Sequence, residues 1–241
     1  MPRSKLILAW VAAAIGVAAA VSLGNWQTRR GDAKLLLQAQ ADAADRAAPF
    51  EIAATRSSIE SVTAALPRKV RITGVFDSTG TIFLNNRILG GVAGYYVITP
   101  LVIGQGLPAV LIERGWKARS AGEGYTTATP PAGQVTIEGL AVLRPSTLLE
   151  LGSAPKLEVP GIWQNLDYDV YERTTKRSVA RFVVRQAGTV RADTADGLRH
   201  EWPQPASGVD KHRGYAFQWY ALAALISALA GYFAWKTWRG R

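Results

Sequence analysis

Two long apolar segments stand near the ends of the chain, and they constrain its fold more than any other feature. The segment Leu6–Leu23 has 18 residues without a charge, and the segment Tyr215–Trp235 has 21. At 1.5 Å per residue, a helix covers about 27 Å in the first segment and about 32 Å in the second, which is enough to cross a hydrocarbon core. The pattern therefore predicts two transmembrane helices, over residues 6–23 and 212–235.

Each apolar segment has an alternative interpretation. The first resembles a cleaved signal peptide, with Ala18–Ala20 as a small-residue cleavage site. We favour an uncleaved anchor because the segment exceeds a usual signal core and a second span follows. The second segment could be a buried core helix. Its Tyr and Trp ends and the basic tail at residues 236–241 are more typical of a span.

The charges on the short tails indicate an orientation. Two spans place both termini on one side, and Met1–Lys5 together with Lys236–Arg241 hold five bases and no acid. Short segments rich in Lys and Arg stay in the cytoplasm, whereas long translocated domains largely escape this rule. We therefore expect cytoplasmic tails and an outward-facing central domain. The net charge of +10 needs no nucleic-acid partner, because no compact basic patch with interleaved aromatics is present.

The middle of the chain predicts a helical connector over residues 24–66 and a β-rich domain over residues 67–211. The connector continues the first span until Pro49 ends or kinks it. Short β-branched or aromatic runs bounded by Gly, Pro, Asn or Asp then predict strands at 69–77, 81–87, 94–103, 108–116 and 134–143. A short helix over 165–177 and a strand over 179–187 follow. The expected fold is an α+β domain with an antiparallel sheet or small barrel, flanked by transmembrane helices.

Most catalytic chemistry lacks its usual sequence signal. The absence of cysteine excludes disulfides, thiolate metal sites and cysteine nucleophiles. Only two histidines occur, His200 and His212, and the chain has no G-x-S-x-G, H-E-x-x-H or phosphate-binding P-loop motif. A membrane-anchored hydrolase would have to depend on a residue such as Ser146 or His200. We expect no enzyme.

His212 is the residue that most needs an explanation, because it lies at the beginning of the second predicted span. An ionisable group at a span is a functional hypothesis, and neutral imidazole is a common axial ligand of haem iron. On a helix it shares one stripe with aromatic and small residues, namely Tyr215, Ala216, Trp219 and Ala223. The alternative is a histidine solvated among headgroups beside Lys211 and Arg213. From the stripe alone both remain open.

The end of the first span emerges at the same membrane face as His212. It has the sequence GNWQTRR and contains Trp26, Gln27, Arg29 and Arg30. Arginine forks suit carboxylates such as haem propionates. The alternative is that Trp26 anchors the interface and the arginines solvate the boundary.

Small residues four apart could let the two spans approach each other closely. They are Ala12, Gly16 and Ala20 in the first span and Ala223, Ser227 and Gly231 in the second.

Six stretches in this order carry a family resemblance: LGNWQTRR, RITGVFD, IFLNNR, GYYVITPL, VLIERGW and HRGYAFQWYALA. Together with the two-span layout, they resemble the Surfeit locus protein 1 family of membrane factors that assist cytochrome c oxidase assembly. One departure is KARS after RGW, where the family usually has a Val-Pro-like pair. Within VLIERGW, we expect Glu113 and Arg114 at a strand end, with Gly115 allowing a turn, and Arg114 and Trp116 as parts of the domain structure.

The resemblance implies a non-enzymatic factor that binds haem a transiently and assists its insertion into subunit I of the oxidase. His212 matches the histidine thought to bind haem a in bacterial members, and Trp26 matches the family tryptophan. Trp219 and Tyr215 would then flank the ring, while Arg29 or Arg30 meets the propionates. The implied partners are subunit I, haem a synthase and membrane lipid. The implied location is the cell inner membrane, with a periplasmic domain. The alternative is a haem-independent scaffold that holds an oxidase assembly intermediate.

Overall fold

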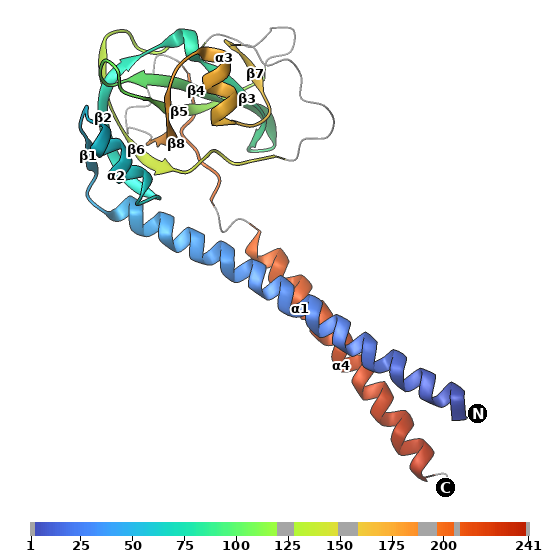
Figure 1. The fold of residues 1–241 in the computed structure, drawn as a ribbon. Helices are drawn as coiled ribbons and strands as arrows, with labels where there is room; N and C mark the ends of the chain where they lie inside the picture. Colours follow the sequence, from blue (N-terminus) through green and yellow to red (C-terminus); the bar gives the residue numbers. More distant parts are fainter. Residues whose placement is uncertain (1–2, 120–127, 149–158, 188–196, 205–207, 240–241) are drawn as a thin grey trace. The chain divides into compact units, whose positions relative to one another are not determined.

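The computed structural model describes residues 3–119, 128–148, 159–187, 197–204 and 208–239, which form two compact units (Figure 1). The first unit combines Met1–Gln40 with Pro203–Arg241, and we call it the helix pair. The second unit is Ala41–Trp202, and we call it the sheet unit.

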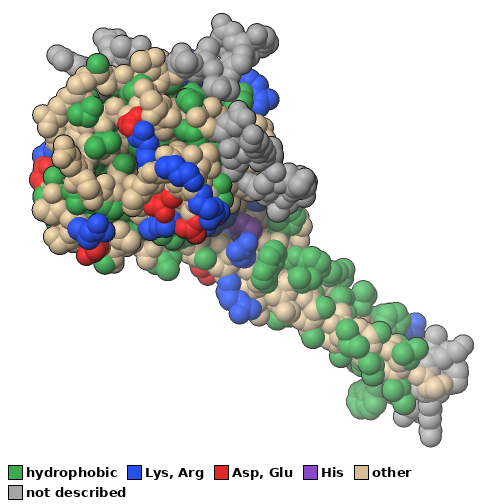
Figure 2. Space-filling model, turned by 45° about the horizontal axis from the view of Figure 1, so that its top comes forward, with side chains coloured by type: hydrophobic (Ala, Val, Ile, Leu, Met, Phe, Trp, Pro, Cys, Tyr) green, Lys and Arg blue, Asp and Glu red, His purple; other side chains and the backbone are tan. Residues whose placement is uncertain are grey.

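The helix pair consists of α4 (Val209–Arg239) and of α1 (Arg3–Arg46) as far as Gln40, and the two helices run antiparallel with both chain termini at one end (Figure 1). Both helices are long and apolar enough to cross a membrane. In the most apolar 18-residue segments of the two helices, only 6% and 11% of the residues are buried. Most of their apolar side chains therefore point outward, where lipid can surround them. Figure 2 shows hydrophobic side chains along the surface of this unit. The helix α1 ends at Arg46, three residues before Pro49, and the remainder of the expected connector contains a strand and a short helix.

The two helices meet along a seam whose least exposed positions alternate in steps of three and four residues. Along α1 they include Ala13, Val17, Ala20, Gly24, Gln27, Gly31 and Lys34, and along α4 they include Val209, His212, Ala216, Trp219, Ala223, Ile226 and Ala230. This alternation is the packing pattern of left-handed coiled coils.

Of the six small residues predicted at the contact surface, half lie at the seam and half are exposed, the latter being Ala12, Ser227 and Gly231. A strict four-residue step drifts about 40° around a helix at each repeat, so it leaves the seam.

The sheet unit is built on one eight-stranded mixed sheet in the order β1-β2-β6-β8-β5-β4-β3-β7. The strands are β1 (Phe50–Ile52), β2 (Arg68–Phe76), β3 (Ile82–Leu89), β4 (Val92–Val102), β5 (Ala109–Ala118), β6 (Gln134–Val142), β7 (Gly161–Trp163) and β8 (Val179–Gln186). The pairs β1–β2, β3–β7 and β5–β8 are parallel. The predicted layout of two helices flanking an α+β domain is confirmed. The sheet is mixed rather than purely antiparallel, and it is not a clear barrel.

Two short helices cover opposite faces of this sheet. The helix α2 (Arg56–Thr63) places Ile59 and Val62 in one buried cluster, and α3 (Tyr168–Thr175) places Tyr171 in the other. Neighbouring residues of β5 divide between the clusters, since Val110 belongs to the first and Leu111 to the second. The central strand is therefore buried on both faces, which explains its nearly continuous apolar run.

The strand β5 does not end at Glu113 and Arg114, so that expectation is wrong. It continues to Ala118, with a register shift in its pairing to β4 beside Gly115. A Cβ atom on Gly115 would lie 2.7 Å from the Cβ of Leu198, so this position needs glycine for a close approach rather than for a turn. Glu113 and Arg114 consequently lie inside the sheet unit, at 0% and 1% exposure.

Candidate functional site

The candidate site lies at the end of the helix pair formed by residues 24–34 and 209–220, which we call the polar end. Here the seam changes from alanines and aliphatic side chains to glycines, amides and aromatic hydroxyls. In the described part of the chain, the helix pair has its only histidine at this end.

His212 lies in the first turn of α4 and is hydrogen-bonded across the seam. Its Nδ1 is 2.7 Å from Oε1 of Gln27 on α1, and both side chains are half-buried. Gly31 faces it, since a Cβ atom there would lie 3.7 Å from the Cβ of His212. Among the described residues no hydrogen bond reaches Nε2 of His212. One ring nitrogen is therefore held while the other retains its coordinating capacity.

A second polar contact crosses the seam farther along α4. The hydroxyl of Tyr220 donates to Oδ1 of Asn25 at 2.8 Å and lies 3.4 Å from Oγ1 of Thr28. The Tyr220 ring packs on Gly24, where a Cβ atom would fall 2.6 Å from Cε1. We call the pairs Gln27–His212 and Asn25–Tyr220 the two polar rungs. Hydrogen bonds between helices help to fix their register in lipid.

The structure divides the remaining predicted site residues between the seam and the outer surface. Trp219 is half-buried in the seam, whereas Tyr215 is 53% exposed and Trp26 is 50% exposed. The Arg30 guanidinium lies 6.0 Å from the centroid of the Trp26 ring, and Nε of Arg29 donates to the backbone oxygen of Asn25 at 3.3 Å. The residues Tyr215, Trp26, Arg29 and Arg30 thus lie at the surface of the polar end and outside the seam.

Sequence reasoning placed Gln27 on the same side as His212 but gave it no role. The signal that identifies it is the seam itself. Continuing the alternating steps from Ala20 through Gly24 brings Gln27 to the contact face.

Positive charge gathers around the polar end. Residues 29–34 and 210–213 carry five bases, Arg29, Arg30, Lys34, Lys211 and Arg213, against two acids, Asp32 and Asp210. The amino end of α4 adds the partial positive charge of its helix dipole. This excess favours an anionic group at the same membrane face.

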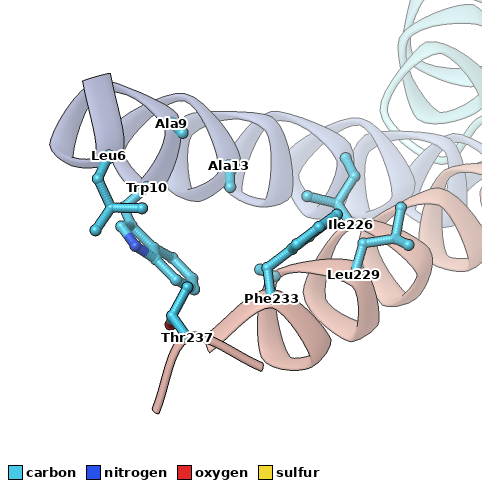
Figure 3. Close-up of a pocket in the computed structure, with 9 residues that line it drawn as sticks. Leu6, Ala9, Trp10, Ala13, Ile226, Leu229, Phe233 and Thr237 are labelled. Carbon is cyan, nitrogen blue, oxygen red and sulfur yellow. The ribbon is translucent and has the colours of Figure 1, made fainter. Parts of the chain in front are cut away.

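The opposite end of the helix pair has an apolar groove of about 450 Å³ (Figure 3). In Figure 3, Trp10 of α1 and Phe233 of α4 stand on opposite sides of the groove. Ala13 at its border is 14 residues from Gln27, or about 21 Å along a helix. No histidine or carboxylate lines it, so it offers no metal ligand.

The described residues contain no group of three or more His, Asp or Glu side chains able to hold a metal ion. A site with several protein ligands therefore has no basis in this part of the chain. A metal that arrives inside a macrocycle needs only one axial nitrogen, and His212 can supply it.

The sheet unit contains a separate buried polar cluster. Oε2 of Glu113 accepts a hydrogen bond from Nε of Arg185 at 3.0 Å, while Oε1 of Glu113 and both Nε and Nη1 of Arg87 have no hydrogen-bond partner in the described part of the chain. Burial raises the pKa of Glu113, which Arg185 and Arg87 only partly oppose. Burial, with Glu113 nearby, also raises the pKa of Tyr96 to about 12. These groups are enclosed by strands, so we assign them to the domain core.

A model of the SURF1 family matches residues 14–224. The chain belongs to the SURF1 family. This family is associated with cytochrome c oxidase assembly. The two apolar helices indicate membrane association, which is consistent with membership of this family. No curated protein matches the chain.

The region that matches the SURF1 family includes one end of the helix pair and not the other. It contains both polar rungs and the sheet unit. Every residue that lines the groove in Figure 3 falls outside it, before residue 14 or after residue 224. The polar end is therefore the part of the helix pair that belongs to the family match.

Proposed function

We propose that this protein is an assembly factor for cytochrome c oxidase that binds haem a at the polar end and assists its insertion into subunit I. The observation that carries the proposal is the hydrogen bonding of the two ring nitrogens of His212. Its imidazole is fixed in the helix seam through Nδ1, and Nε2 has no partner among the described residues. Family membership supports the link to the oxidase.

The side chains at the polar end fit a flat macrocycle with two carboxylates. His212 offers an axial nitrogen, Trp219 and Tyr215 offer aromatic surface for the ring, and Arg29 and Arg30 offer guanidinium groups for propionates. Trp26 would border the same region. When bound, the haem supplies an iron that accepts the imidazole nitrogen. The residues of the chain bind and orient the macrocycle, and no catalysis is required of them.

The same arrangement suits release as well as binding. His212 would be the single ligand that the helix pair gives to the iron, and four of the proposed contact residues, Tyr215, Trp26, Arg29 and Arg30, are exposed. Binding through so few enclosed groups suits transient carriage more than permanent retention. We propose haem a synthase as the donor, subunit I as the acceptor, and a surface of the sheet unit as the docking site on the oxidase. The location consistent with the basic tails is the cell inner membrane, with a periplasmic sheet unit.

The test is to produce the full chain in a membrane of cells that make haem a, and to compare haem spectra of purified variants. We expect His212→Ala to lose the haem, whereas His200→Ala, which removes the only other histidine, retains it. Added imidazole should restore binding in His212→Gly, which separates loss of the ligand from loss of folding. Unchanged haem content in His212→Ala would overturn the proposal.

A haem-independent scaffold is the second candidate. It is favoured by the two polar rungs, which complete the contact between α1 and α4 without any ligand. In this case His212→Ala should spare oxidase assembly in cells, and substitutions on the surface of the sheet unit should impair it.

A further inference from the structure

We propose that Gln27 is a positioning residue that selects the tautomer of His212 and thereby presents Nε2 for metal binding. The inference rests on the proposed function, because it assigns a role within the same haem-binding site.

The geometry of the first polar rung carries the proposal. Oε1 of Gln27 lies 2.7 Å from Nδ1 of His212, a short distance for a hydrogen bond between neutral groups. An amide oxygen only accepts, so Nδ1 carries the hydrogen. A neutral imidazole has a single N–H, and Nε2 is therefore left with its lone pair. Metal-bound histidines commonly use the second nitrogen in this way, to fix both tautomer and ring orientation.

Packing on both sides holds the rung in place. Gly24 and Gly31 are three residues before and four residues after Gln27, and both are buried. The Tyr220 ring packs on Gly24, and Gly31 meets the Cβ of His212. These glycines let α4 approach α1 closely on both sides of Gln27. The close packing of the two helices therefore holds the Gln27 amide against the His212 imidazole.

The strength of the acceptor should tune the bound metal. A carboxylate at position 27 would attract the Nδ1 hydrogen more strongly and make Nε2 a better electron donor, which lowers the reduction potential of a bound iron. An aliphatic side chain would remove the acceptor and raise that potential. A purely structural role for Gln27 predicts no such opposite shifts.

The tautomer can be tested without haem. The full chain, labelled with ¹⁵N-histidine and placed in lipid bilayers, contains only two imidazoles, and His200→Gln assigns the signals. We expect the ¹⁵N shifts of His212 to show hydrogen on Nδ1, and Gln27→Leu to abolish this preference. The matched control is Gln218→Leu, the same substitution at an exposed position of α4. Hydrogen on Nε2 in the wild type would overturn the inference.

Redox titration of the haem a-loaded protein provides the second readout. We expect Gln27→Glu to lower the midpoint potential and Gln27→Leu to raise it, with Gln218→Leu equal to wild type. Shifts in the same direction, or none, would overturn the inference. If the wild type binds no haem, the proposed function fails, while the ¹⁵N shifts still decide the tautomer.

Discussion

The Cβ position of Gly31 lies 3.7 Å from the Cβ of His212, which is the separation that two cysteines adopt in a disulfide. This pair joins two helices that are far apart in sequence, and the chain has no cysteine of its own. An engineered disulfide can therefore report on the contact between the two helices without interference from native cysteines.

We expect Gly31→Cys combined with His212→Cys to oxidise readily in membranes, measured as loss of thiol alkylation by mass spectrometry. The control combines Gly31→Cys with Gly214→Cys, because a Cβ atom on Gly214 meets nothing within 4 Å. Equal oxidation of both pairs would contradict the packing of α4 on α1.

Close contact at Gly24 predicts a cost for even one methyl group. In Gly24→Ala the new Cβ atom would lie 2.6 Å from Cε1 of Tyr220, and overpacking of this kind typically costs about 1–3 kcal/mol. We expect slower disulfide formation between cysteines at positions 31 and 212. Gly231→Ala is the control, since its Cβ atom has open space. Adding Tyr220→Ala should recover the rate, and a failure to recover would place the effect elsewhere.

The buried carboxyl of Glu113 predicts a pH dependence of stability. Because burial raises its pKa above the ordinary value of 4.5, the folded protein binds this proton more tightly than the unfolded chain. The free energy of unfolding should therefore fall as the pH rises from about 4.5 towards the folded-state pKa, by at most about 1.4 kcal/mol per pH unit.

Thermal unfolding of the full chain by near-ultraviolet circular dichroism measures this effect. We expect Glu113→Gln to flatten the dependence above pH 4.5, whereas the exposed Glu60→Gln leaves it unchanged. A steeper dependence in Glu113→Gln would refute the direction of the shift.

Membrane orientation can be checked with single cysteines in the otherwise cysteine-free chain. Gln105 is exposed in the β4–β5 connection, and Arg239 is exposed at the end of α4. We expect an impermeant thiol reagent to label Gln105→Cys in cells whose inner membrane is intact. Arg239→Cys should be labelled only after that membrane is disrupted. The reverse pattern would place the sheet unit in the cytoplasm.

Sequence patterns predicted the longer strands well, because alternation and bounding Gly, Pro and Asn residues are local. The runs at 69–77 and 134–143 correspond to β2 and β6, with boundaries that differ by at most one residue. The strands β1 and β7 have three residues each, too few to show a period. The helix α2 was not distinguished within the expected helical connector, although Thr55 caps it by accepting from the backbone N–H of Ser58. The parallel β5–β8 pairing joins distant segments and leaves no local signal.

The candidate site was predictable on one helix but not between the two. The stripe on α4 was interpreted as a surface for a ligand, and its residues Ala216, Trp219 and Ala223 lie in the seam, whereas Tyr215 lies outside it. Positions three and four residues after His212 are equally close to it on a helix, and only the partner helix decides which one is buried. The role of Gln27 depends on how α1 and α4 are aligned, which neither sequence segment contains by itself.

The two polar rungs also determine where the His212 imidazole lies along the axis of α1. Between them and the groove the seam contains mainly alanine and aliphatic side chains, which would tolerate sliding of one helix along the other. A slip of one turn would carry His212 about 5.4 Å along the helix axis. If the proposed function holds, Gln27 and Tyr220 would thus set the height at which the haem is offered to the oxidase.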